Sequence, residues 1–168
     1  MSRLTLEENY NFDFVLFAIN SSFPDYQICF CINNALEIDM HKESPIELQN
    51  KKQKGHLEFS MFQFYDEENF LNYELISNRS YNSVSAIEKD NGKKITQGDL
   101  FSNHEEATQQ IGFLIPELEK TDYLLVVRTE YDSSLINFIE KSLKKIEEIS
   151  SIRYVKPDDL NSKKNLIF

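Results

Sequence analysis

The chain has 168 residues, of which 40% are hydrophobic and 12% are aromatic, and this is enough to enclose one hydrophobic core. Its formal net charge of −10 repels phosphate backbones and anionic lipid headgroups, so nucleic-acid and membrane partners are disfavoured. The longest apolar run, residues 14–19, is too short to span a bilayer, and residues 1–11 lack the apolar core of a signal peptide. We therefore expect a single cytoplasmic domain over residues 1–168.

The apolar run at residues 14–19 predicts a strand that is covered on both faces. Pro24 and Asp25 suit the first turn of a helix over residues 24–36, because proline fits the first helical position and a carboxylate favours the positive end of a helix. The apolar side chains of this helix recur with a helical period. They are Ile28, Cys31, Ile32, Ala35 and Leu36. We expect this stripe to pack on the strand.

Alternating polar and apolar residues predict further strands in the middle of the chain. Residues 37–40 predict a short edge strand, and a polar surface loop is expected over residues 43–55. Residues 57–64 and 71–75 predict a hairpin, in which a change of parity indicates a bulge near Met61.

Residues 79–114 are polar and weakly patterned. We expect an insertion there, with Asn91-Gly92 as a candidate tight turn. A second apolar run at residues 123–127 then predicts the other central strand.

The last third of the chain predicts a helix over residues 134–148, capped by Asp132 or Ser133, and an edge strand at residues 152–155. The expected apolar stripe of this helix is Leu135, Phe138, Ile139, Leu143 and Ile146. The fold class is therefore α+β, with an antiparallel or mixed sheet and two helices on one face. We interpret it as a ferredoxin-like split β-α-β arrangement with an insertion, and expect right-handed crossovers to place the two central strands side by side and parallel.

Residues 115–123 carry a motif. They read Ile115-Pro116-Glu117-Leu118-Glu119-Lys120-Thr121-Asp122-Tyr123. This stretch resembles the signature of the IPExxxVDY family, small proteins of Bacteroidetes, with Thr121 where the family name has Val. Residues 24–26, 67–69, 75–78 and 165–168 are similar to that family as well. The resemblance implies a cytoplasmic bacterial protein and brings no assigned activity, cofactor or catalytic residue. From the residues themselves, Pro116 and Glu117 favour one short helical turn before Asp122 and Tyr123.

Two carboxylates, Asp25 and Asp122, are candidates for an acid–base pair. If the central strands are parallel, the two residues lie at opposite ends of the sheet, about 15–20 Å apart at ~3.3 Å per residue. We therefore expect Asp25 to serve a helix start and Asp122 a turn.

The remaining chemistry-bearing residues follow no recognised site pattern. The histidines, His41, His56 and His104, lie in separate segments without ligand spacing, so we expect surface positions. Cys29 and Cys31 cannot easily bridge from one helix, and we expect reduced thiols with Cys31 packed in the core. No glycine motif for a nucleotide or a nucleophile is present. The sequence predicts no metal, no cofactor and no catalytic residue.

Two functions stay open. The first is a non-enzymatic binding or regulatory module that acts through protein contacts, with an unknown protein partner or a second copy of the chain. The alternative is a small enzyme, or a sensor of anions such as phosphometabolites, at the end of the sheet where Asn20 and Ser22 would meet Arg128. The apolar chain end, Leu166-Ile167-Phe168, should dock on its own sheet or on a partner, and we favour its own sheet.

Overall fold

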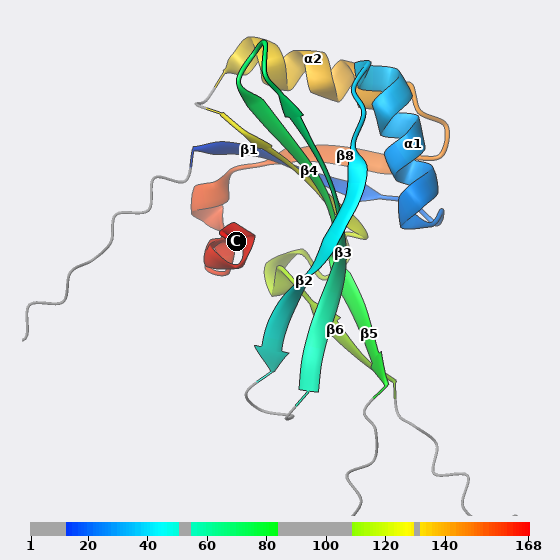
Figure 1. The fold of residues 1–168 in the computed structure, drawn as a ribbon, viewed down its shortest axis with the longest axis vertical. Coiled ribbons are helices and arrows are strands. Elements are labelled where there is room, and N and C mark those ends of the chain that lie inside the picture. Colours follow the sequence, from blue (N-terminus) through cyan, green and yellow to red (C-terminus); the bar gives the residue numbers. More distant parts are fainter. Residues whose placement is uncertain (1–12, 51–54, 84–108, 130–131) are drawn as a thin grey trace, which may run out of the picture.

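The computed structural model describes residues 13–50, 55–83, 109–129 and 132–168. In this part of the chain, two helices and a six-stranded antiparallel sheet form an α+β fold (Figure 1). The strands follow the order β2-β3-β4-β7-β1-β8. Their bounds are β1 Phe14–Asn20, β2 His41–Asn50, β3 Gly55–Asp66, β4 Leu71–Ser77, β7 Tyr123–Arg128 and β8 Ser151–Val155.

The two central strands, β1 and β7, lie side by side as expected, but they are antiparallel. Phe14 pairs with Arg128 at one end, and Ile19 pairs with Tyr123 at the other. The expectation of parallel strands was wrong because the chain crosses to the far edge at β2 and returns to β7 in three antiparallel steps. The ferredoxin-like arrangement stays a prediction, since the described sheet has six strands rather than the four of a β-α-β-β-α-β unit.

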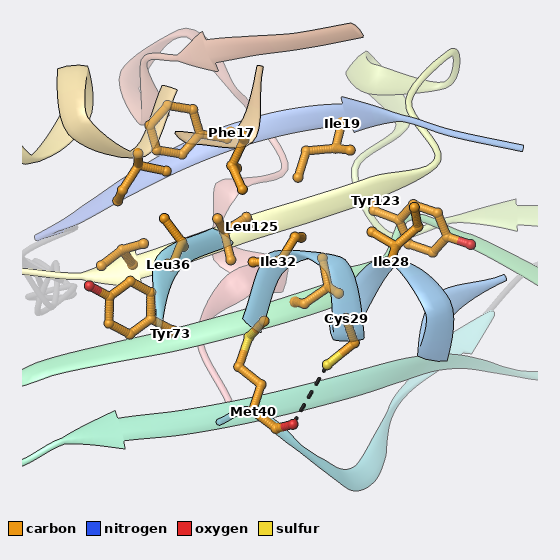
Figure 2. Close-up of a cluster of buried hydrophobic side chains, with 14 of the residues drawn as sticks. Phe17, Ile19, Ile28, Cys29, Ile32, Leu36, Met40, Tyr73, Tyr123 and Leu125 are labelled. Carbon is orange, nitrogen blue, oxygen red and sulfur yellow. Dashed lines mark hydrogen bonds between the residues drawn. The ribbon is translucent and has the colours of Figure 1, made fainter. Parts of the chain in front are cut away.

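Both faces of the sheet are buried, as the two apolar runs predicted. The helices α1 (Asp25–Leu36) and α2 (Ser133–Leu143) cover one face, where Val15, Phe17 and Ile19 join their apolar side chains (Figure 2). The other face is covered by residues 114–118 and by the end of the chain. Each residue of β1 therefore packs on one of two separate clusters.

The apolar stripes of both helices differ from the expected ones. In α1, Cys29 is buried and Cys31 is only partly buried, so the buried stripe includes Cys29 in place of Cys31. In α2, Ile136 is buried and Phe138 is 54% exposed. This helix ends at Leu143, earlier than expected, because the next backbone N–H groups donate to carbonyls three residues back, as in a 3-10 helix.

The expected surface loop at residues 43–55 was wrong, because most of it is the edge strand β2. The strand escaped detection since Ile46 alone among its first eight residues is buried. The expected bulge near Met61 lies instead in β2, where the register shifts between Glu43 and Ile46. A strand at residues 37–40 is absent from the structure; Glu37 there ends α1 with a left-handed backbone.

The insertion at residues 79–114 is described at its two ends, where β5 (Arg79–Ser83) pairs with β6 (Gln109–Phe113). This two-stranded arm packs on β3, since a Cβ atom at Gly112 would collide with the side chain of Leu57. The expected turn at Asn91-Gly92 lies outside the described residues.

Candidate functional site

The three residues of the expected anion site do not come together. Asn20 and Ser22 follow the end of β1, whereas Arg128 pairs with Phe14 at its start. Six residues of extended strand separate the two ends, a span of roughly 20 Å. The antiparallel register therefore divides the expected site between opposite ends of the central strands.

Arg79 takes the place that was expected for Arg128. Its guanidinium lies 3.2 Å from one oxygen of Asp122, whose other oxygen accepts a 3.0 Å hydrogen bond from the N–H of Ser21. The hydroxyl of Tyr123 donates to the carbonyl of Phe23 at 2.6 Å. The end of the signature thus clamps the loop that leads from β1 into α1. No sequence pattern pointed to Arg79, which lies in the weakly patterned insertion.

Several N–H groups that could attract an anion at this end are used by the chain itself. Tyr26 donates its N–H to Asp25 at 2.8 Å, and Ser21 donates to Asp122. The reasoning that placed Asp25 and Asp122 at opposite ends was wrong, because the antiparallel register brings both to the same end. Asp25 begins α1, as expected, whereas Asp122 holds the loop after β1 through Ser21 and Arg79 rather than serving its own turn.

Arg128 belongs to a second cluster at the other end of the sheet. Its guanidinium donates to Glu74 at 2.7 Å and to the carbonyl of Leu166 at 2.8 Å, and it lies 5.1 Å from the ring centroid of Phe168. Burial raises the pKa of Glu74, although Arg128 and a hydrogen bond from Asn72 favour the charged form. Arg128 therefore anchors the chain end, and Leu166 is fully buried in its own chain, as we favoured.

Asn78 holds the start of the signature in place. Its side chain is fully buried; the carbonyl oxygen accepts from the N–H of Ile115 at 2.8 Å, and the amide donates to the carbonyls of Leu118 and Thr121. The expected short turn is present at Pro116–Leu118.

Glu117 joins that turn to the end of the chain. Its carboxylate accepts a hydrogen bond from the N–H of Ser162 at 2.8 Å. Residues 115–118 of the signature therefore form a structural clasp on the face opposite the helices, while Asp122 and Tyr123 hold the loop after β1.

The cysteines are placed for packing. Burial, with the charges of Asp25 and Asp39, raises the pKa of Cys29 to about 11, and its thiol donates to the carbonyl of Met40 at 3.6 Å (Figure 2). Burial also raises the pKa of Cys31. At neutral pH both are protonated thiols, which are poor nucleophiles.

Among the described residues, no group of three or more His, Cys, Asp or Glu side chains could hold a metal ion. His41 is exposed beside Asp39 at 3.3 Å. The side chains of His56 and His104 lie outside the described part. No described helix has the length and apolar character needed to cross a membrane.

A groove of about 1060 Å³ lies on the helix side of the fold, and we call it the hairpin groove. It is bounded by the β3–β4 turn, the end of α1 and the start of α2, which approach one another in Figure 1. Apolar and aromatic side chains line much of it: Leu36, Ile38, Phe64, Tyr65, Leu71, Tyr73, Leu135 and Phe138. Sequence reasoning missed this groove, although exposed Phe138 and the acidic turn at residues 66–69 both belong to it.

The β3–β4 turn at the groove is well ordered by its own hydrogen bonds. Asp66 accepts from the N–H groups of Glu68 and Asn69, and the Asn69 amide donates to it at 2.7 Å. The side-chain and backbone bonds from Asn69 lower the pKa of Asp66. The next residue, Phe70, has a φ of 55° and is 76% exposed.

No family model, curated protein or solved structure matches the chain. The resemblance to the IPExxxVDY family therefore stays a prediction that rests on the motif.

Proposed function

We propose that this protein is a non-enzymatic, cytoplasmic binding module that holds a protein partner at the hairpin groove. The observation that carries the proposal is Phe70. A bulky residue in the left-handed region is strained, and a ring that is 76% exposed gains little from burial within its own chain. Neither local geometry nor packing explains a phenylalanine here, whereas a contact surface does.

Phe70 lies on the β3–β4 turn between two lining residues, Asn69 and Leu71, but is not itself part of the lining. Two other exposed aromatic residues are. Tyr65 is 52% exposed and Phe138 is 54% exposed, and both line the hairpin groove. Exposed aromatic side chains around a hollow are typical of protein-binding sites, because they bury a large area at a small cost in side-chain entropy.

The rest of the described molecule favours binding over catalysis. The carboxylates of the signature, Glu117 and Asp122, are occupied by backbone N–H groups. The thiols have raised pKa values. The buried pair of Glu74 and Arg128 anchors the chain end. These groups serve the fold, while the exposed aromatic side chains have no such role.

A comparison of pull-downs tests the proposal. Phe70→Asn removes the ring and suits the left-handed backbone, so the variant should fold at least as stably as the wild type. The matched control is Phe30→Ala, which removes an aromatic ring that is 65% exposed on α1, away from the groove. Wild type and control should retain the same partner from a lysate, and Phe70→Asn should lose it.

The proposal fails if Phe70→Asn retains every protein that the wild type retains. It also fails if Phe30→Ala loses the partner to the same degree, because the contact surface would then lie on α1.

A further inference from the structure

The lining of the hairpin groove combines an apolar floor with a rim of one sign of charge. The carboxylates around it are Glu37, Asp66, Glu67, Glu68 and Asp132, and none of the described lining residues is Lys or Arg. Asp66 and Asp132 accept hydrogen bonds from backbone N–H groups. Among the described residues, Glu37, Glu67 and Glu68 have no ion-pair partner.

Tyr73 adds a polar group to the lining of the groove. Its side chain lines the groove and the residue is 6% exposed, so the ring is held in the core against Phe64. Figure 2 shows its hydroxyl pointing away from the other labelled side chains. This hydroxyl has no hydrogen-bond partner in the part of the chain that the structure describes. The hydroxyl keeps contact with solvent, so a bound segment could take the place of that water.

The chemistry of the occupant follows from these features. Carboxylates without partners attract cationic groups, and the apolar floor accepts aliphatic or aromatic side chains. The Tyr73 hydroxyl can bond to a peptide carbonyl or N–H that lies along the floor. Nucleic acid and anionic lipid are repelled by the same rim and by the net charge of −10.

We propose that the hairpin groove binds a peptide segment of the partner in which Lys or Arg side chains alternate with apolar ones. This inference rests on the proposed function and names the partner class for the same surface. The apolar side chains fill the floor beside Leu71 and Leu135, and the basic side chains face Glu67 and Glu68 on the β3–β4 turn.

Three short peptides, labelled with fluorescein and matched in length, test the inference by fluorescence anisotropy. In the first, Leu and Lys alternate; in the second, Glu replaces Lys; in the third, Ser replaces Leu. The Leu-Lys peptide should bind best, and both replacements should weaken binding. Added salt should weaken the Leu-Lys complex, because exposed charge pairs are screened.

Charge reversal on the protein provides the matched variants. Glu67→Lys with Glu68→Lys should reduce affinity for the Leu-Lys peptide about tenfold, since each lost exposed pair is worth a few-fold and each new repulsion adds a similar amount. Glu58→Lys with Glu119→Lys changes the net charge equally at exposed positions outside the groove, and affinity should stay within about twofold.

Failure of this inference is distinguishable from failure of the proposed function. Equal binding of the Leu-Lys and Leu-Glu peptides, or an equal loss in both double variants, overturns the basic partner class, while the Phe70-dependent pull-down would still stand. Absence of binding to all three peptides overturns the inference as well. If the wild type and Phe70→Asn retain the same proteins in the pull-down, the proposed function itself is wrong.

Discussion

A single buried amide, Asn78, explains why the signature segment lies where it does. It satisfies the N–H of Ile115 and the carbonyls of Leu118 and Thr121, all on the face opposite the helices. The segment makes few hydrogen bonds of the kind that join strands, so the hydrogen bonds from Asn78 satisfy its buried backbone groups instead. The sequence favoured a short turn at Pro116, and the structure confirms it. Nothing in the sequence pointed to Asn78 as its partner, because the contact spans about forty residues.

Asn78→Ala should therefore destabilise the protein strongly. Several buried backbone groups would lose their partner at once, and each unsatisfied group costs about 1–3 kcal/mol, so a loss of ~3 kcal/mol or more in the free energy of unfolding is expected. Denaturant titration measures it. Asn161→Ala, at an exposed position, is the control and should stay within about 0.5 kcal/mol. A loss of similar size in both variants would contradict the role of Asn78.

The pH dependence of stability should distinguish Glu74 from Glu117. Burial raises the pKa of Glu74 above the ordinary value of 4.5, so the folded state holds its proton to higher pH than the unfolded state. The stability that wild type has relative to Glu74→Gln should then be greatest below 4.5 and fall as pH rises through the raised pKa. Unfolding titrations over a series of pH values check this.

Glu117 should show the opposite sign. Burial would raise its pKa, but hydrogen bonds from backbone N–H groups, including that of Ser162, outweigh this and lower it. The stability of wild type relative to Glu117→Gln should be present above 4.5 and be lost as pH falls through the lowered pKa. If the stability difference between wild type and variant changed with pH in the same direction for Glu74→Gln and Glu117→Gln, at least one of the two pKa assignments would be wrong.

At the scale of elements, the apolar runs were the most informative part of the sequence. Residues 14–19 and 123–127 predicted β1 and β7 closely, because continuous apolar residues suit strands buried on both faces. The edge strand β2 was missed since an edge needs few buried side chains, and Pro45 at its register shift obscured the alternation. Strand direction could not be read from local pattern, as it depends on how many reversals separate two strands.

The end of the chain behaves as a docked element. Leu166 is fully buried among residues of its own sheet, whereas Ile167 is 40% exposed. Leu166→Ala should lower the free energy of unfolding by about 2–5 kcal/mol, the cost of a cavity in a packed core. Ile167→Ala is the matched control and should cost much less. Both variants should keep the mass of the wild type in light scattering.

A change of oligomeric mass in Leu166→Ala, without a loss of stability, would instead show that the chain end is exchanged between two copies. Equal stability of Leu166→Ala and the wild type at unchanged mass would contradict docking altogether.

For the whole molecule, the fold class could be predicted from the sequence and the contact surface could not. The hairpin groove is assembled from α1, the β3–β4 turn and α2, which are far apart in the chain. Its exposed aromatic residue Phe138 was expected in the core, because helical spacing alone does not show where a neighbouring helix stops covering a face. The expected anion site failed for a related reason, since the antiparallel register placed Arg128 at the far end.

The net charge of −10 and the acidic rim of the groove act together at this scale. The negative electrostatic field attracts basic partners over a distance that the ionic strength sets. In the proposed function, the apolar floor then binds partners that carry apolar side chains. Under this proposal, charge attracts the partner and the aromatic side chains select it.

Site-specific photo-crosslinking tests the central claim most directly. A benzophenone side chain is placed at Phe70 and, in separate samples, at the exposed positions Phe30 and Ile111, and each protein is irradiated in a lysate of the cells that produce it. The account predicts a discrete cross-linked protein from Phe70 alone, competed by excess wild type but not by Phe70→Asn. Cross-linking of the same protein from all three positions, or competition by Phe70→Asn equal to that by wild type, would contradict it.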